Sequence, residues 1–237
     1  MPKSCYFIFF GTLNDFLPHS VYGMKRKYSF FGNPSIMDAI EAQGIPHTEI
    51  GLILINNAPN NSNSKIQAGD QIEVYPNREY IKNDSKIEFI VDSHLGKLAK
   101  NLRILGFDCL YDTNYIENRI CEIAEQENRV VLTRNVGLLK NKRILHGYWL
   151  RSQEPSKQLQ EVIDNLKLKD KIKPFFRCRL CNGLINKISK LTIEDQLLPM
   201  TKAHFNEFFQ CEECNRIYWK GSHYEKLMKL IESTLKA

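Results

Sequence analysis

Two pairs of cysteines, each spaced C-x-x-C, constrain the C-terminal part of this chain more than any other feature. The first pair is Cys178 and Cys181, and the second is Cys211 and Cys214. A C-x-x-C segment forms a tight turn that presents two thiolates, and Zn²⁺ prefers four ligands of this kind in a tetrahedron. Because four cysteines leave no position open for water, we expect a structural zinc site that holds a small ribbon together. The alternatives are unpaired buried cysteines and redox chemistry, and the second is disfavoured because neither pair opens a helix after a strand.

The other three cysteines, Cys5, Cys109 and Cys121, lie on expected strands or helices and are interpreted as core residues. No apolar run approaches the roughly 18 to 20 residues that a membrane helix needs. The N-terminus lacks the small-residue cleavage site of a signal peptide. We therefore expect a cytoplasmic protein without membrane association, and in that reducing compartment cysteines favour metal binding over disulfides.

Positive charge gathers towards the C-terminal end. The whole chain has 33 Lys and Arg against 27 Asp and Glu, a net charge of +6, and residues 171–237 carry twelve of the basic residues against seven acidic ones. This distribution is expected if the C-terminal end contacts a polyanion. Lysines on solvated helix surfaces are the alternative.

Residues 1–78 have the order of a β-grasp domain: two strands, a helix and two more strands. The expected helix is 35–43, and the expected strands are 5–10, 27–31, 51–56 and 71–75. The segments GIPHTEIGLILINN and GDQIEVYP resemble the ubiquitin-like β-grasp of small sulfur-carrier proteins. Those carriers end in Gly-Gly, whereas this segment reaches Arg78 and continues. The resemblance therefore leaves a docking or scaffolding role towards a protein partner.

After a polar linker at 77–86, strands and helices alternate along the chain. We expect strands at 86–92, 107–111, 129–133 and 144–150, and helices at 93–105, 116–126, 136–141 and 156–168. Alternation with this period predicts a parallel sheet with helices on both faces. The predicted domains are a β-grasp over 1–78, a parallel α/β domain over 86–170 and a zinc ribbon with a basic aromatic tail over 171–237.

Polar side chains follow the expected strands of the middle domain. Asp92 ends the first strand and Asp112 the second, Glu117 opens the next helix, and Asn135 follows the third strand. In an open parallel sheet such residues collect at one edge, and converging acids suggest Mg²⁺ or Mn²⁺. These metals activate water for phosphodiester hydrolysis. Helix caps and turns are the alternative interpretation of Asp92 and Asp112.

Three long motifs, IVDSHLGKLAKNLRILGFDCLYD, RVVLTRNVGLL and RCRLCNG…CEECNRIYWKGSHY, resemble the Mut-seven C-terminal RNase domain family. In that family a PIN-like nuclease fold is fused to a zinc ribbon, and a ubiquitin-like domain can precede it. The resemblance implies a divalent-metal-dependent endoribonuclease with Asp92 as the first metal-binding acid. It places Asn135 where the family motif LTRD has a metal-binding Asp, and an amide weakens the site because it brings no charge. Asp112 and Glu117 are the remaining candidate acids.

Basic residues in the matching motifs are candidate RNA contacts, either to phosphates or beside stacked bases. These candidates are Lys97, Arg103, Arg134, Lys220 and His223. The alternative for Lys97 and Arg103 is the exposed face of an amphipathic helix. Aromatic side chains near Lys220 and His223 are of the kind that stacks on unpaired bases, whereas packing of the ribbon is preferred for Trp219.

The expected function is hydrolysis of RNA phosphodiesters by metal-activated water, with tRNA or another structured RNA as the substrate. The rival from another class is a catalytically degraded RNA-binding or adaptor protein, which Asn135 favours. A sulfur carrier or ubiquitin-type modifier is disfavoured by the missing terminal glycines, and a toxin role is disfavoured by the added domains.

Overall fold

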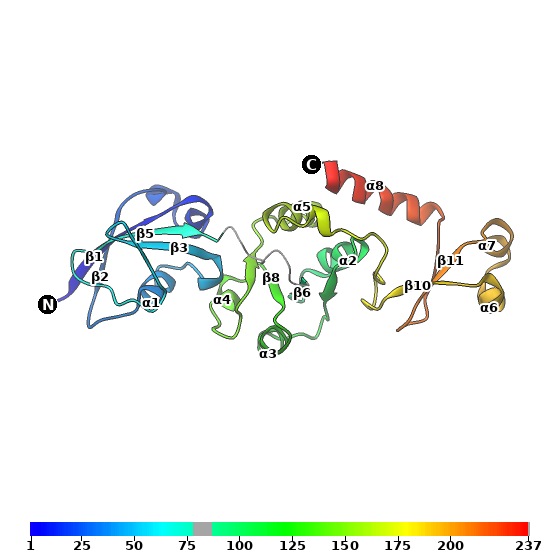
Figure 1. The fold of residues 1–237 in the computed structure, drawn as a ribbon, viewed down its shortest axis with the longest axis horizontal. Helices are drawn as coiled ribbons and strands as arrows, with labels where there is room; N and C mark the ends of the chain where they lie inside the picture. Colours follow the sequence, from blue (N-terminus) through cyan, green and yellow to red (C-terminus); the bar gives the residue numbers. More distant parts are fainter. Residues whose placement is uncertain (78–86, 237) are drawn as a thin grey trace. The chain divides into compact units, whose positions relative to one another are not determined.

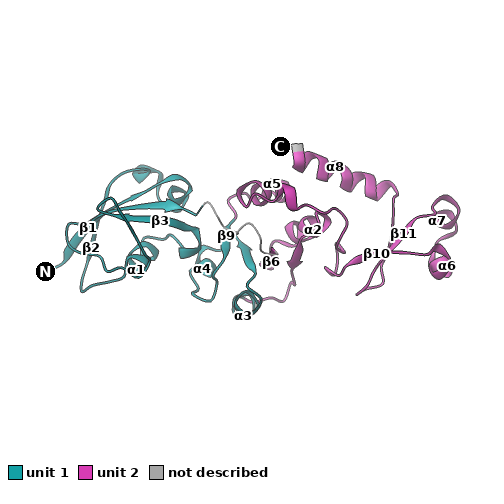
Figure 2. Cartoon of the chain, in the orientation of Figure 1, with its two compact units in different colours: residues 1–85, 117–149 teal, residues 86–116, 150–237 magenta. Residues whose placement is uncertain are grey.

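In the computed structural model, which describes residues 1–77 and 87–236 (Figure 1), the chain divides into two units (Figure 2). Unit 1 consists of Met1–Ser85 and Glu117–Trp149, and unit 2 of Lys86–Ile116 and Leu150–Ala237. The predicted domain limits remain a prediction. Of the predicted linker at 77–86, only Asn77 is among the described residues. No helix in the described ranges combines the length and the apolar character needed to cross a membrane.

The N-terminal part of unit 1 is a mixed five-stranded sheet in the order β2-β1-β5-β3-β4. Strands β1 and β5 are parallel, and the other neighbours are antiparallel. Its elements are β1 (Lys3–Phe9), η1 (Gly11–Phe16), η2 (His19–Val21), β2 (Arg26–Phe30), α1 (Ile36–Glu41), η3 (His47–Glu49), β3 (Ile50–Ile55), β4 (Ala58–Asn60) and β5 (Gln71–Pro76). The four predicted strands and the helix of the β-grasp are therefore confirmed.

Alternation of apolar and polar residues along β1 places Cys5, Phe7 and Phe9 in the core beneath α1. Ser35 caps α1 by accepting a hydrogen bond from the backbone N–H of Asp38 at 3.1 Å. Strand β4 was not predicted, because it lies in an asparagine-rich stretch. The two asparagines before it, 56 and 57, have φ of +52° and +66°, which is the left-handed backbone of a tight hairpin turn.

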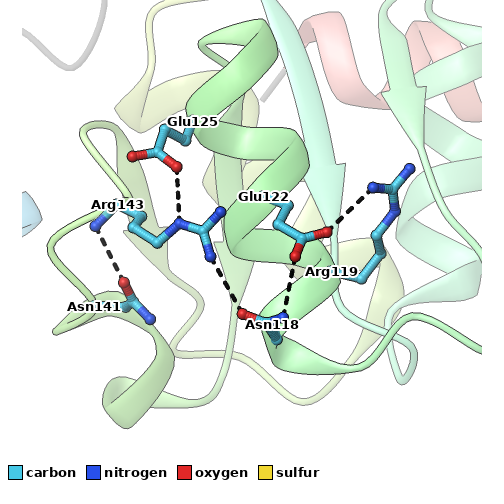
Figure 3. A network of polar contacts seen from close by, with 6 residues as sticks. All are labelled: Asn118, Arg119, Glu122, Glu125, Asn141 and Arg143. Carbon is cyan, nitrogen blue, oxygen red and sulfur yellow. Dashed lines mark hydrogen bonds and ion pairs between the residues drawn. The ribbon is translucent and has the colours of Figure 1, made fainter.

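The rest of unit 1 begins with helix α3 (Glu117–Glu127) and strand β8 (Val130–Thr133), followed by helix α4 (Val136–Leu139) and strand β9 (Gly147–Trp149). Strands β8 and β9 pair in parallel. Arg143, in the loop before β9, donates hydrogen bonds to Glu125 at 2.8 Å and to Asn118 at 3.2 Å (Figure 3). Both partners lie on α3, so this network holds α3 against the loop.

Unit 2 combines a parallel strand pair with an antiparallel three-stranded ribbon in the order β10-β11-β12. The parallel pair and its helices are β6 (Glu88–Val91), α2 (Gly96–Ile104), β7 (Asp108–Leu110) and α5 (Pro155–Asn165), followed by η4 (Lys169–Lys171). The ribbon and its helices are β10 (Ile185–Ile188), α6 (Lys190–Ile193), η5 (Glu194–Gln196), α7 (Pro199–His204), β11 (Phe208–Cys211), β12 (Ile217–Trp219) and α8 (Ser222–Lys236).

Helix α2 buries Leu98, Ala99 and Leu102 completely, as the spacing of three and four residues predicts. It packs beside α5. The fold class is confirmed: a ubiquitin-like sheet, parallel α/β elements and a C-terminal ribbon that carries the four cysteines. Helices α6, α7 and α8 were not predicted.

Candidate functional site

The four predicted zinc ligands come together in unit 2, with all four Sγ atoms within 4.8 Å of one another. The Sγ atoms of Cys178 and Cys214 are 3.7 Å apart, and those of Cys181 and Cys211 are 3.3 Å apart. Sulfurs arranged tetrahedrally around Zn²⁺ lie about 3.8 Å from each other. The cluster therefore fits a Zn²⁺ ion with a closed, structural ligand shell.

Both cysteine pairs use the same turn. The residue after each pair, Asn182 or Asn215, has a left-handed backbone, with φ of +75° and +56°. Its N–H donates to the carbonyl of the first cysteine of the pair, Cys178 or Cys211, at 3.0 and 3.1 Å. At Gly183 a Cβ atom would lie 2.9 Å from the Cys211 Sγ, so only glycine lets the two turns approach this closely.

The environment of Cys178 favours its thiolate, which is the form that binds Zn²⁺. Burial alone raises the pKa of the Cys178 thiol, but the Cys181 backbone N–H and the Tyr218 hydroxyl donate hydrogen bonds to it and bring the pKa down to about 6. The Tyr218 oxygen lies 3.0 Å from the sulfur. Burial and the neighbouring Cys178 raise the pKa of Tyr218, so its hydroxyl remains a donor.

The first cysteine turn is hydrogen-bonded to strand β7. Asn182, only 8% exposed, accepts from the Cys109 backbone N–H at 3.0 Å and donates to the Asp108 carboxylate at 2.9 Å. Arg177 forms an ion pair with the other oxygen of Asp108 at 2.8 Å. The ribbon is therefore attached to the parallel strand pair through buried polar contacts.

Arg103, a predicted RNA contact, takes part in the same attachment. It is 3% exposed. Its guanidinium donates to the carbonyls of Cys109 at 2.8 Å and Leu180 at 2.5 Å. These bonds direct the side chain into the protein, where it joins α2, β7 and the first cysteine turn.

The predicted acids Asp92 and Asp112 occupy matching positions beyond β6 and β7. The two strands are parallel with Ile90 opposite Leu110, so each acid lies two residues past the last pair. Each carboxylate accepts a hydrogen bond from the backbone N–H two residues ahead, at 3.0 Å for Asp92 and 2.8 Å for Asp112. Both therefore close turns, and the residue that precedes α2 as its cap is Leu95.

Tyr111 links the two loops that carry these acids. Its hydroxyl donates to the Ser93 carbonyl at 3.2 Å. A Cβ atom on Gly96 would lie 2.5 Å from the Tyr111 hydroxyl oxygen, so a glycine at the start of α2 makes room for the ring. The tyrosine thus fixes the β7 end beside the β6–α2 loop.

In unit 1, the predicted site residues Glu117 and Asn135 are in direct contact. The Asn135 amide nitrogen donates to the Glu117 carboxylate at 2.6 Å. The Asn135 side-chain oxygen caps α4 by accepting from the backbone N–H of Gly137 at 2.9 Å. Both sides of this amide are therefore occupied, and both residues are exposed.

The other predicted RNA contacts lie at the surface. Lys97 and Arg134 are exposed, on α2 and at the end of β8. Lys220 and His223 are exposed next to β12, where Lys220 forms an ion pair with Glu207 at 2.7 Å. Asn182 and Tyr218, which contact the cysteine cluster or its first turn, were not among the predicted site residues, although the repeated pattern C-x-x-C-N indicates a turn shared by both pairs.

Comparison with protein families gives two matches. The family model described as Mut7-C RNAse domain matches residues 87–231, and the one described as Mut7-C ubiquitin matches residues 2–82. None of the curated proteins matches the sequence. The resemblance stated from the three motifs, with a ubiquitin-like domain ahead of the RNase domain, is confirmed.

Proposed function

The chain belongs to the Mut7-C RNAse domain family, and from that premise we propose that it is a divalent-metal-dependent endoribonuclease that hydrolyses RNA phosphodiesters. The match over residues 87–231 carries the proposal. Asp92 and Asp112 support it, because they follow neighbouring parallel strands within the matched range. The carboxyl ends of parallel strands are where active sites form in such sheets.

Asp92 is proposed as the principal ligand of Mg²⁺ or Mn²⁺, with Asp112 and Glu117 as further acids. Carboxylate oxygens are the ligands that these hard cations prefer. The metal, when bound, supplies an activated water and stabilises the leaving oxygen. The turns that their carboxylates close fix the orientation of the Asp92 and Asp112 side chains, which supports the proposal. The four cysteines hold Zn²⁺ in a structural role.

RNA is the proposed substrate, with tRNA or another structured RNA as its class. The exposed side chains of Lys97 and Arg134 are proposed to contact phosphates. Lys220 and His223 are proposed to contact RNA beside the ribbon. The ubiquitin-like domain is proposed to bind a protein partner, and the cytoplasm is the proposed location.

Asn135 favours a second candidate, an RNA-binding protein of the same family that no longer cleaves. An Asp at this position would bring a second carboxylate next to Glu117, and such a pair is stable when a cation lies between the acids. Asn135 instead donates its own amide to Glu117. The amide thus satisfies the acid without a metal.

The test is cleavage of a structured RNA by the zinc-loaded full-length chain in the presence of Mn²⁺. We expect wild type to cut and Asp92→Asn to lose at least about a hundredfold in rate, since even outer-shell partners of metals contribute about 10- to 100-fold. Asp195→Asn, the same change at an exposed acid on η5, is the matched control and keeps the wild-type rate.

Two results separate the candidates. Cleavage by Asp92→Asn at the wild-type rate would overturn the proposed site. If wild type is inactive but Asn135→Asp cuts, the protein is the non-cleaving RNA binder, and its metal site was lost at Asn135.

A further inference from the structure

Unit 2 contains a cavity of about 590 Å³ beside the zinc ribbon, here called the ribbon pocket. Its walls come from residues 173–177, 179 and 180, from strands β11 and β12, and from the start of α8. Cavities of about 300–1,000 Å³ are the usual size for a bound small molecule or a single building block of a polymer. The ribbon pocket is therefore large enough for one nucleotide.

Aromatic side chains dominate this lining. They are Phe175, Phe176, Phe209, Tyr218, Trp219 and Tyr224. Phe176 and Trp219 remain 46% and 37% exposed, although both are large and apolar. Exposed apolar surface gathered in a concave site points to a ligand. Flat rings of this kind are the surfaces on which unpaired bases stack.

The charged side chains of the lining are all basic. None of the described residues that line the ribbon pocket is Asp or Glu, and five are Lys or Arg. Two of these five form ion pairs with acids, Arg177 with Asp108 and Lys220 with Glu207. Lys173, Arg179 and Arg216 form no ion pair with any described residue, so their positive charge would attract an anionic ligand to the pocket.

One wall of the ribbon pocket is held in a strained backbone conformation. Phe175 has a φ of +60°, which is unfavourable for a bulky side chain. Its N–H donates to the Ile104 carbonyl at 2.9 Å, and its ring stacks on Tyr224 at 4.6 Å. Strain that the surroundings impose in this way is typical of ligand sites.

We propose that the ribbon pocket binds an unpaired nucleotide of RNA, with the base stacked against Phe176 and Trp219. The flanking phosphates lie against Lys173, Arg179 and Arg216. An unpaired nucleotide is required, because bases inside an A-form duplex do not present their faces to a protein. This inference rests on the proposed function, since it names the class of RNA that the same protein holds, and it assigns the ribbon the task of holding a single-stranded segment.

The first test is fluorescence anisotropy with a fluorescein-labelled single-stranded RNA of about ten nucleotides, a length within the usual site sizes of such proteins. The zinc-loaded full-length chain is used without Mg²⁺ or Mn²⁺, so binding is measured apart from cleavage. For the double variant Arg179→Glu/Arg216→Glu we expect a loss of affinity of at least about tenfold and a salt dependence whose slope falls by about 1.4. Lys229→Glu, a charge reversal on an exposed part of α8 outside the pocket, is the matched control and binds as wild type does.

The second test follows the stacking itself. RNA is expected to quench the fluorescence of Trp219, and Trp219→Ala is expected to bind about tenfold more weakly, whereas Trp219→Phe keeps most of the affinity because a ring remains. Bound zinc is measured for each variant. If a Trp219 variant has lost its zinc, Phe176→Ala is used in its place. Phe176 is also proposed to stack on the base, and its side chain is already 46% exposed, so its truncation disturbs the fold less.

Several results would overturn the inference. These are equal affinity of the double variant and Lys229→Glu, equal binding of duplex and single-stranded RNA, and displacement of the RNA by an acidic peptide of the same charge. The experiments distinguish failure of this inference from failure of the proposed function. Undiminished cleavage with unchanged affinity in the pocket variants refutes only the pocket, and RNA binding at the pocket without any cleavage refutes only the nuclease.

Discussion

Glu49 is a fully buried acid in unit 1, 0% exposed, and its carboxylate accepts a hydrogen bond from the Trp149 backbone N–H at 2.7 Å. It thereby joins the η3 turn of the ubiquitin-like sheet to the end of β9. The Phe16 ring packs against Trp149 at 4.6 Å in the same place. A buried N–H needs its acceptor, so the contact matters more through the penalty of its loss than through its own strength.

We predict that Glu49→Ala lowers the free energy of unfolding by about 1.5–3 kcal/mol, the usual size for a hydrogen bond to a charged group. Urea unfolding followed by circular dichroism measures the change. Glu125→Ala is the matched control, because it removes an acid that is 51% exposed and pairs with Arg143 at the surface (Figure 3). Exposed ion pairs contribute little, so its loss should be several times smaller. Equal losses for the two variants would show that the Glu49 contact does not hold these elements together.

At the scale of the elements, two asparagines allow the attachment of the first cysteine turn to β7 to be tested, because only one of them contacts β7 with its side chain. Asn182 and Asn215 share the left-handed backbone and the same place after a cysteine pair. Only the Asn182 side chain bonds to β7, through the Cys109 N–H and the Asp108 carboxylate. Both Asn182→Ala and Asn215→Ala place an alanine in a left-handed backbone, so this cost cancels when their free energies of unfolding are compared. The remaining difference measures the Asn182 side-chain contacts to β7.

We predict that Asn182→Ala costs about 2–3 kcal/mol more than Asn215→Ala in the unfolding of the zinc-loaded protein, because it removes two hydrogen bonds away from bulk solvent, one of them to a carboxylate. Urea titration of both variants measures the difference. If both variants lose the same free energy, the side-chain contacts to β7 contribute nothing beyond the turn.

Secondary-structure elements and ligand sets were predictable where the sequence pattern that encodes them lies within a short segment. The β-grasp strands follow from alternation, and the zinc ligands follow from spacing within two short turns. Helix α8 was not predicted, although Leu227, Leu230 and Ile231 recur at helical spacing among its basic and aromatic residues. Strand β4 gave no apolar pattern, since all three of its residues are exposed.

Contacts that depend on the tertiary fold were not predictable from the sequence. Arg103 has the sequence environment of a surface arginine on an amphipathic helix, and its partners Arg179 and Leu180 lie far away in the chain. The hydrogen bond from Asn135 to Glu117 joins two residues that the strand-end pattern had selected separately. The family motif marked the position of Asn135, but only the structure reveals what its amide does.

At the scale of the whole molecule, we expect the two units to depend differently on a metal ion held by the four cysteines. The ubiquitin-like sheet of unit 1 has its own apolar core, which includes Phe7, Phe9 and Val74. The ribbon in unit 2 has short strands, carries the cluster of four cysteines and is attached to β7 by polar contacts. Metal binding in such a small module supplies much of its folding free energy.

We therefore predict that removing zinc with a chelator unfolds the ribbon and leaves the ubiquitin-like sheet folded. Limited proteolysis of the full-length chain should then cut within 171–237, whereas the surviving fragment retains the ubiquitin-like sheet with strands β1 to β5. Cys211→Ser should reproduce the effect without a chelator. Cys121→Ser, the same change at a buried cysteine of α3 outside the cluster, should keep the ribbon resistant. A ribbon that stays resistant after zinc is lost would mean that its hydrogen bonds to β7 are sufficient to fold it.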